Sequence, residues 1–341
     1  MIETDAVVIG AGPVGLFQVF ELGLLGLRAE VVDSLPVAGG QCVELYADKP
    51  IYDIPATVVC TGRELIARLL AQIAPFHAGL HFGQQVDALA RQPDGRFLLT
   101  TSTQTRLLAK VVIIAAGVGS FQPRRLKIDG LAEYEARQVF YAAPPDDDSL
   151  AGQRVVVIGD EDPALEFANR LSTTARVTLL HRRDDFRATP AAVDRLRALR
   201  AAGAIDFIAG QPTGSRASDG RLRALQVLAP DGTTQERELD VLVVLTGLSP
   251  RLGPIAGWGL ALERKQLVVD SASFATSEPG IFAVGDVNTY PGKRRLILCG
   301  FHEATLAAYG AAAHAVPGAP IPLEYTTTSP RLHRALGLAA S

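Results

Sequence analysis

The chain has 341 residues, of which 48% are hydrophobic and 20% charged, and its formal net charge is −3. This length favours two domains over a single core, and the composition is that of an ordinary globular protein rather than a disordered one. The small negative charge gives no general argument for binding nucleic acid. No apolar run approaches the ~20 residues that a membrane span needs. We therefore expect neither nucleic acid nor a membrane as a partner, and no signal peptide.

The predicted elements follow one another as α/β units. Short β-branched runs alternate with stretches rich in Ala and Leu, which indicates parallel sheets covered by helices. Turns at Pro93-Asp94-Gly95 and Pro230-Asp231-Gly232 predict one antiparallel insertion in each half. The predicted strands are 6–9, 29–33, 97–102, 106–109, 111–115, 154–158, 176–180, 222–228 and 236–244, the last overlapping a strand also predicted at 239–245, and the predicted helices are 16–25, 63–73, 164–171 and 191–202. The two halves thus repeat one scheme, which predicts two Rossmann-like three-layer nucleotide-binding domains.

The first half opens with a complete dinucleotide-binding motif. Gly10 makes the tight turn after the first strand, Gly12 lets a pyrophosphate approach the backbone, and Gly15 lets the helix pack on the strand. The helix N-terminus offers free N–H groups to the phosphates. Asp33, 23 residues after Gly10, ends the next strand, where a carboxylate can accept hydrogen bonds from ribose hydroxyls. This order of elements predicts a site for FAD or NAD.

The second half has an arginine where the first has Asp33. The residue 23 positions after Gly159 is Arg182, and Arg183 and Arg187 add positive charge nearby. An acid selects a free 2′-hydroxyl, whereas Arg accommodates a 2′-phosphate through charge-assisted bonds. The second site is therefore predicted to bind NADP, and an NADH preference is disfavoured. The bland alternative is a basic, solvated loop.

Three acids complicate this second site. Glu161 stands at the position of the second glycine, and Asp160 and Asp162 flank it. Three carboxylates at a helix N-terminus would repel a pyrophosphate, at roughly 1–3 kcal/mol per unfavourable contact. Two hypotheses follow: either NADPH binds weakly, or the site has been lost while the fold survived.

Cys42, Cys60 and Cys299 form neither a CxxC motif nor a metal-binding spacing. We expect three buried or idle thiols in a reducing cytoplasm, and no metal.

Four further peptides carry a resemblance to a known family. They are Gly39-Gly40-Gln41, the stretch 45–55, the stretch 276–287 that contains Gly285-Asp286, and the tail 325–333. Over essentially its full length the chain resembles the bacterial ferredoxin–NADP reductases of the thioredoxin-reductase-like type. The absence of a CxxC between Cys60 and Cys299 makes electron transfer to thioredoxin very unlikely.

The resemblance implies how the chain is organised and what it does. Residues 1–120 and 249–341 would form a discontinuous FAD domain, and residues 121–248 an inserted NADPH domain, in a homodimer. NADPH would deliver hydride to flavin N5, and the reduced flavin would pass single electrons to a ferredoxin or flavodoxin. A basic dock for an acidic ferredoxin is expected at Lys293-Arg294-Arg295 or at 331–334, with a solvated face as the default.

The resemblance also assigns individual residues. Tyr46 would stack on one flavin face and Tyr325, from the partner subunit, on the other, with His333 a weaker candidate. Asp286 would hold the ribityl chain beside Gly285, and Thr326 would bond the flavin edge. The remaining implied contacts to FAD are Pro13, Gly40, Gln41, Val86 and Phe121, and those to NADP are Gly159, Ala164, His181, Arg182, Arg183 and Arg187.

One alternative of a different class stays open. The chain would then be an FAD-binding dimer with a decayed nicotinamide site that acts as a redox sensor or scaffold. This alternative rests on the acids at 160–162, which would repel the pyrophosphate of a nicotinamide nucleotide.

Overall fold

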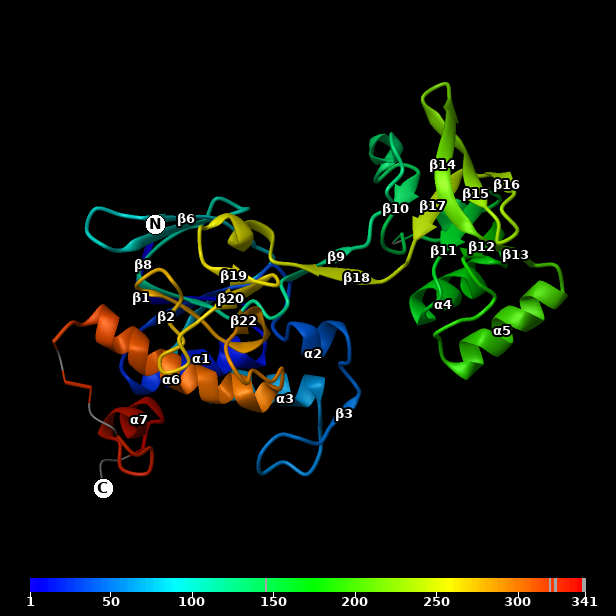
Figure 1. Ribbon diagram of the computed structural model, residues 1–341. Coiled ribbons are helices and arrows are strands. Elements are labelled where there is room, and N and C mark those ends of the chain that lie inside the picture. Colours follow the sequence, from blue (N-terminus) through cyan, green and yellow to red (C-terminus); the bar gives the residue numbers. More distant parts are fainter. Residues whose placement is uncertain (145, 319, 322–323, 339–341) are drawn as a thin grey trace. The chain divides into compact units, whose positions relative to one another are not determined.

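The computed structural model describes residues 1–144, 146–318, 320–321 and 324–338. It divides into two compact units, residues 1–120 with 251–341 (unit 1) and residues 121–250 (unit 2). The chain crosses between them in β9 (Ser120–Pro123) and β18 (Leu248–Arg251), which pair as a two-stranded sheet (Figure 1). The side chains of residues 120–122 and 248–250 lie outside the description, and with them the side chain of Phe121.

Unit 1 is built on a seven-stranded sheet. Its order is β5 (Gly79–His81), β2 (Ala29–Val32), β1 (Ile2–Ile9), β8 (Arg106–Ile114), β7 (Phe97–Thr101) and β6 (Val86–Arg91). β21 (Ile281–Ala283) joins from the far end of the sequence and pairs in parallel with the last three residues of β8. The prediction of two separate strands at 106–109 and 111–115 is wrong. β8 is continuous because β1 pairs along its length, while β7 and β21 share its other edge.

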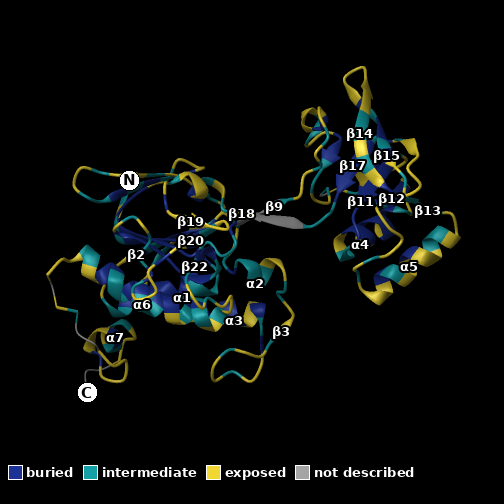
Figure 2. Cartoon of the chain, viewed as in Figure 1, coloured by how far each residue is buried: buried dark blue, intermediate teal, exposed yellow. Residues whose placement is uncertain are grey.

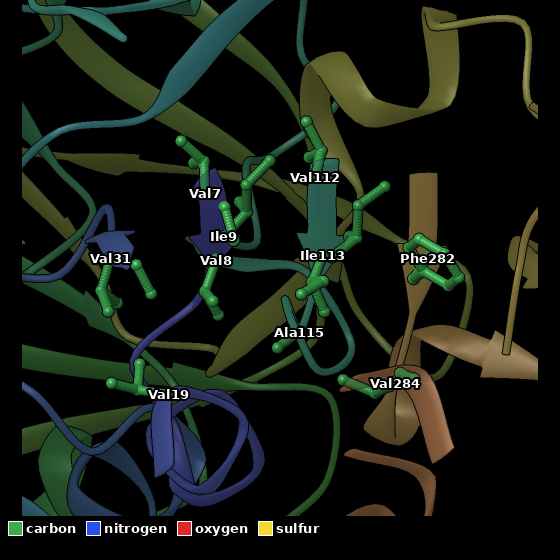
Figure 3. Close-up of a cluster of buried hydrophobic side chains, with 14 of the residues drawn as sticks. Val7, Val8, Ile9, Val19, Val31, Val112, Ile113, Ala115, Phe282 and Val284 are labelled. Carbon is green, nitrogen blue, oxygen red and sulfur yellow. The ribbon is translucent and has the colours of Figure 1, made fainter. Parts of the chain in front are cut away.

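The core of unit 1 lies where β1 and β8 run side by side. Val7, Val8, Val112 and Ile113 are fully buried there, with Phe282 of β21 beside them (Figure 3). Both faces of these strands are covered, so the strands show continuous apolar runs rather than alternation. This arrangement fixes the carboxyl ends of β1 and β8 next to each other, at the edge where a parallel sheet binds its ligands.

Helices cover one face of this sheet. α1 (Pro13–Leu24) contacts β1 and β2, and packs against α3 (Gly62–Ile73) and α6 (Ile297–Ala315). α6, with 19 residues, was not among the predicted helices, because its Ala-rich sequence is apolar on most sides and shows little periodicity. The smaller elements of unit 1 are α2 (Gln41–Glu44), α7 (Pro330–Ala335), η1 (Ala74–Phe76), η4 (Gly253–Gly257), η5 (Gly285–Val287), β3 (Pro50–Ile51), β4 (Cys60–Thr61), β19 (Leu262–Glu263), β20 (Gln266–Val268) and β22 (Asn288–Thr289).

Unit 2 has a five-stranded parallel sheet with different cover on its two faces. The order is β10 (Val139–Phe140), β17 (Val241–Val244), β11 (Arg154–Ile158), β12 (Arg176–His181) and β13 (Ile205–Ala209). Val155 and Val157 pack towards α4 (Asp162–Leu171) and α5 (Pro190–Ala201). Val156 and Ile158 pack towards the antiparallel sheet of β14 (Gln211–Ser218), β15 (Arg221–Leu228) and β16 (Thr234–Glu238).

This alternation follows the period of two that a strand imposes. The strands β11, β12 and β17, which lie between the helices and the antiparallel sheet, are buried and dark blue in Figure 2. The predicted strand 236–244 is in fact two strands, β16 and β17, because Leu239 and Asp240 turn the chain from the antiparallel sheet into the parallel one, and the overlapping prediction 239–245 corresponds to β17. Unit 2 also contains η2 (Leu131–Tyr134) and η3 (Asp148–Leu150). The parallel strands β5, β2, β1, β8 and β21 of unit 1 and the parallel sheet of unit 2, each covered by helices, confirm the predicted α/β class. Among the described residues, none of the helices is both long and apolar enough to cross a membrane.

Candidate functional site

Two glycines of the first loop are required by packing. Gly10 has φ +111°, and a Cβ there would lie 2.4 Å from the carbonyl oxygen of Ala115 at the end of β8. A Cβ on Gly15 would lie 1.9 Å from the carbonyl oxygen of Gly10, so α1 could not approach the turn. These glycines hold β1, β8 and α1 together at the switch point of the sheet.

Gly12 is a glycine for a different reason. It is the extended N-cap residue of α1 (φ −71°), a conformation open to any residue, and a Cβ there would meet nothing within 4 Å. No side chain caps the helix, which starts at Pro13 and leaves its first N–H groups facing this space. Gly40 lies against the same point, since its Cβ would be 3.3 Å from Gly12 Cα. The loop therefore forms an open cradle for an anionic group.

Asp33 ties the end of β2 to this loop. Its Oδ2 accepts a hydrogen bond from Ala11 N at 2.6 Å and its Oδ1 accepts one from Leu35 N at 2.8 Å. Burial raises the pKa of the carboxyl group, and the two N–H donors partly offset that rise. The structure thus places Asp33 beside the glycine loop, as the motif predicts.

Tyr46, Cys42 and Asp286 come together next to the loop. The Tyr46 hydroxyl lies 3.4 Å from Cys42 Sγ, in the turn that follows α2. Burial raises the pKa of Tyr46, and the Cys42 thiol and the Asp286 carboxylate raise it further. Gln41 stands at the start of α2, with its amide 3.1 Å from where a Cβ on Gly117 would be. Val86 is buried at the start of β6, so it packs in the core.

A buried polar network that sequence reasoning missed holds the Gly285-Asp286 turn. Glu303 of α6 is fully buried, and its Oε2 accepts hydrogen bonds from Gly285 N at 2.7 Å and Asn288 Nδ2 at 2.8 Å. Its Oε1 accepts one from the Tyr290 hydroxyl at 3.0 Å and pairs with Lys293, which also donates to Gly285 O at 2.8 Å. Burial and the Glu303 carboxylate raise the pKa of Tyr290 to about 12.

This network overturns one expectation and shows a signal that was available. Lys293 was expected in a basic dock, but its side chain is only 8% exposed and pairs with Glu303. Arg294 and Arg295 remain exposed. A single carboxylate inside an Ala-rich helix pointed to a buried acid with a partner.

The tail residues do not lie with Tyr46 within one chain. Tyr325 is 70% exposed, and Thr326 is also exposed. α7, which contains His333, is held at the C-terminal end of α1, where Arg331 Nη1 donates to Leu24 O at 3.1 Å. The glycine loop is at the other end of this 12-residue helix, about 18 Å away. Figure 1 likewise shows α7 and α2 on opposite sides of unit 1.

The loop of unit 2 repeats the packing of the first loop. A Cβ on Gly159 would lie 2.5 Å from the Leu245 carbonyl oxygen and 2.5 Å from Ala164 Cβ. Leu245 follows β17 as Ala115 follows β8, and Ala164 stands where unit 1 has Gly15. Glu161 is the extended N-cap residue of α4, in the place of Gly12.

Each of the three acids in this loop has a partner. Arg187 donates from Nε to Asp160 Oδ2 at 2.7 Å and from Nη2 to Asp160 Oδ1 at 3.2 Å. Its Nη2 also lies 3.0 Å from Glu161 Oε1. Asp162 Oδ1 accepts bonds from Thr189 N at 2.7 Å and Thr189 Oγ1 at 2.8 Å. The hydrogen bond from Arg187 lowers the pKa of Asp160. The three acids are therefore already paired within the chain, while the weakened binding of NADPH that we expect from them stays a prediction.

The basic residues after β12 flank the same loop. His181 Nδ1 donates to Arg183 O at 2.9 Å, and its Nε2 lies 3.7 Å from Asp160 Oδ2. Arg182 and Arg183 are exposed. Unit 2 thus presents a helix N-terminus and exposed guanidinium groups at the carboxyl end of one parallel sheet, a pattern suited to a phosphorylated ligand.

Comparison with known proteins gives close relatives among curated sequences. The ferredoxin–NADP reductase of Albidiferax ferrireducens is 57% identical over 99% of this chain and 96% of its own length. That of Paracidovorax citrulli is 56% identical over 100% of this chain and 98% of its own. These matches confirm the resemblance seen in the sequence.

The solved structures agree with this assignment. A thioredoxin reductase from Lactococcus lactis matches with a TM-score of 0.58 and 25% identity, over 92% of this chain and 99% of that one. A bacillithiol disulfide reductase from Staphylococcus aureus shares the fold, with a TM-score of 0.62 and 17% identity over the same shares of both chains. The model of the pyridine nucleotide-disulphide oxidoreductase family matches residues 4–312. The chain therefore belongs to this family.

Proposed function

We propose that the protein is an FAD-dependent ferredoxin–NADP reductase that transfers electrons between NADPH and a ferredoxin or flavodoxin. One observation carries the proposal: the chain has two nucleotide loops whose second strands end differently, in Asp33 and in Arg182. An acid suits a ribose with free hydroxyls and an arginine suits a 2′-phosphate. The near relatives named ferredoxin–NADP reductase support the same activity.

FAD fits unit 1. The open space at Gly12 takes the pyrophosphate, with the first N–H groups of α1, which follow Pro13, as donors. Gly40 and Gln41 line the same cradle, and Asp33 faces the ribose. Asp286 holds the ribityl chain, because the Glu303 network fixes the turn from which its side chain starts.

NADP(H) fits unit 2. The N-terminus of α4, between Gly159 and Ala164, receives the pyrophosphate. Arg182 and Arg183, both exposed, receive the 2′-phosphate. His181 positions Arg183 by donating a hydrogen bond to the main-chain carbonyl of Arg183.

Bound FAD would supply the chemistry of the reaction, which is to take up two electrons as hydride from NADPH and release them singly. The residues of the chain bind, stack and exclude water. Tyr46 covers one face of the ring system, and burial raises the pKa of its hydroxyl, which is neutral at physiological pH. Arg294 and Arg295 form an exposed basic surface for an acidic partner protein.

A homodimer completes this arrangement. Tyr325 is 70% exposed in the single chain and Thr326 is exposed beside it, at the end of α1 away from the glycine loop. They can contact FAD only in a partner subunit, so we place them in the partner's site. The three free cysteines fit a reducing cytoplasm.

Anaerobic titration of the flavin-bound protein tests the proposal. NADPH should bleach the flavin absorbance, NADH should do so only at much higher concentration, and adding oxidised ferredoxin should restore the flavin colour. Changing both Arg294 and Arg295 to Glu should slow ferredoxin reduction at low salt but leave reduction by NADPH unchanged. A flavin that NADPH never bleaches would favour the sensor or scaffold reading instead.

A further inference from the structure

The segment that follows β12 folds back onto the nucleotide loop of unit 2. Arg187 N donates to Asp160 O at 2.7 Å, and Glu161 and Arg187 form an isolated parallel β-bridge. The Arg187 guanidinium then reaches both carboxylates, Asp160 through Nε and Nη2 and Glu161 through Nη2. Its Nη1 has no hydrogen-bond partner among the residues that the structure describes. One guanidinium thus joins two acids and keeps donors to spare.

The two carboxylates hold Arg187 in different ways. Asp160 is 12% exposed, receives two bonds from the guanidinium and has His181 Nε2 at 3.7 Å. Glu161 is 41% exposed and makes a single contact with Arg187 at 3.0 Å. A buried, bidentate partner is costly to break, whereas an exposed single contact is worth little. Asp160 therefore anchors Arg187, and Glu161 can leave it.

Glu161 also occupies the place that an anion needs. It is the N-cap residue of α4, where unit 1 has Gly12 and open space. Its carboxylate reaches both Arg187 and the region beside Gly247, where a Cβ would lie 3.5 Å from Glu161 Oε2. A phosphate of a bound nucleotide would compete for the same guanidinium and the same helix N-terminus.

We propose that Asp160 and Glu161 act in opposite directions on NADP(H) binding, through Arg187. Asp160 is a positioning residue that aims Arg187 at the nucleotide phosphates. Glu161 is an internal competitor, which holds Arg187 in the free protein and swings away when a phosphate takes its place. The inference rests on the proposed function, since it assigns the nucleotide of unit 2 to NADP(H). The energy of displacing Glu161 then lowers affinity and eases release of the product NADP⁺.

A pair of matched variants distinguishes opposite roles of Asp160 and Glu161 from simple repulsion of the nucleotide by both acids. Glu161→Gln and Asp160→Asn each remove one negative charge and keep the side-chain shape, and both acids lie in the same loop. Calorimetric titration of the flavin-bound dimer with NADP⁺ should show binding tightened about 5- to 50-fold by Glu161→Gln and weakened by a similar factor by Asp160→Asn. If the acids merely repelled the nucleotide, both variants would tighten binding, and that result would overturn the proposal.

A double-mutant cycle with Arg187→Gln shows whether the effect passes through the guanidinium. The gain from Glu161→Gln should fall below about twofold when Arg187 is also changed. A gain that persists undiminished would mean that Glu161 acts by its charge alone, against the proposal. Unchanged flavin content and circular dichroism confirm that each variant is folded.

The proposed function and this device fail in different ways. If the unmodified protein binds NADP⁺ but Glu161→Gln binds it no better, the competitor is ruled out and the reductase stands. If neither the unmodified protein nor Glu161→Gln binds NADP⁺ while the flavin remains bound, both are wrong.

Discussion

The two nucleotide loops place their acids on opposite sides of the same junction. In unit 1 the acid follows the second strand, and Asp33 accepts a hydrogen bond from Ala11 N in the loop. In unit 2 the acid is in the loop itself: Asp160 stands where unit 1 has Ala11, and it accepts bonds from Arg187, which follows the second strand. A carboxylate links strand and loop in both junctions, but exposed arginines, Arg182 and Arg183, follow the second strand only in unit 2.

The comparison separates glycines that the fold needs from glycines that the ligand needs. Gly10 and Gly159 both pack against a neighbouring strand end, where a Cβ would lie 2.4 and 2.5 Å from a main-chain carbonyl oxygen, and both are kept. A Cβ on Gly12 would meet nothing within 4 Å, and the counterpart of Gly12 is Glu161. A side chain there disturbs the ligand rather than the protein, so this position is where affinity can be adjusted without loss of the fold.

The largest expected effect concerns the buried Glu303 network, which holds the Gly285-Asp286 turn of unit 1. Glu303→Ala leaves Lys293 buried without its partner and removes the acceptor of Gly285 N, so we expect a loss of about 3–5 kcal/mol in unfolding free energy and loss of FAD. Denaturant titration and flavin content measure both. The exposed pair Arg216–Glu236 of unit 2 is the control, and Glu236→Ala should cost less than about 1 kcal/mol. If the two variants lost the same unfolding free energy, burial would add nothing to the strength of the Glu303 network.

Placing the residue of unit 2 in unit 1 tests the role assigned to Gly12. Gly12→Glu puts a carboxylate in the open cradle of α1, so FAD affinity should fall about 100-fold, or about 2.7 kcal/mol, while the protein still folds. Gly257→Ala is the control, because that glycine also has nothing within 4 Å of its Cβ. Reconstitution of the apoprotein with FAD, followed by fluorescence, gives the affinities. Unaltered FAD binding in Gly12→Glu would place the pyrophosphate elsewhere.

The ion pair between Arg154, at the start of β11, and Asp240, just before β17, should have a smaller effect on stability, and this effect depends on pH. Asp240 accepts three bonds from Arg154, and these lower its pKa to about 2 from 3.8. Because the folded pKa is depressed, the stabilisation is fully present above about pH 5 and is lost as pH falls towards 2. After discounting for solvent screening, Asp240→Asn should cost about 1–2 kcal/mol at pH 7 and almost nothing near pH 2.

Denaturant titration at several pH values checks this dependence on Asp240. Asp5→Asn is the counterpart in unit 1, where Asp5 pairs with Lys110 at 2.8 Å and its pKa is also lowered. A cost of Asp240→Asn that stays constant down to pH 2 would contradict an ion pair as its origin.

Much of the fold was predictable from sequence because local patterns determine it. Strand 154–158 and helix 63–73 were predicted within a residue of their observed ends, since β-branched runs and the Thr61–Glu64 capping box mark them directly. The continuous strand β8 was not, because it depends on distant partners: β1 pairs along its length, and β21, almost 170 residues later in the chain, pairs with its last three residues.

The same limit applies to the sites. The glycine positions and Asp33 follow from spacing along one βαβ unit, and the structure places them together. Partners of charges do not follow, because Asp160 meets Arg187 across 27 residues and Lys293 meets Glu303 inside the fold. Counting charges in the sequence predicted repulsion in one case and a surface dock in the other. Only three-dimensional contact shows which charges are already paired.

The smallest expected effect shows whether the three acids of unit 2 differ in role. Asp162, at the start of α4, accepts hydrogen bonds from the main-chain N–H and the hydroxyl of Thr189, the N-cap residue of α5. Asp162 therefore joins the N-termini of α4 and α5. Asp162→Ala should cost about 1 kcal/mol of stability and change NADP⁺ affinity by less than about threefold. This variant removes the same charge from the loop as Glu161→Gln does. If it tightened NADP⁺ binding equally in calorimetry, net charge alone would govern the loop, and the contrast between Asp160 and Glu161 would lose its basis. A selective response to Glu161→Gln would instead show that position relative to Arg187 decides what each carboxylate does.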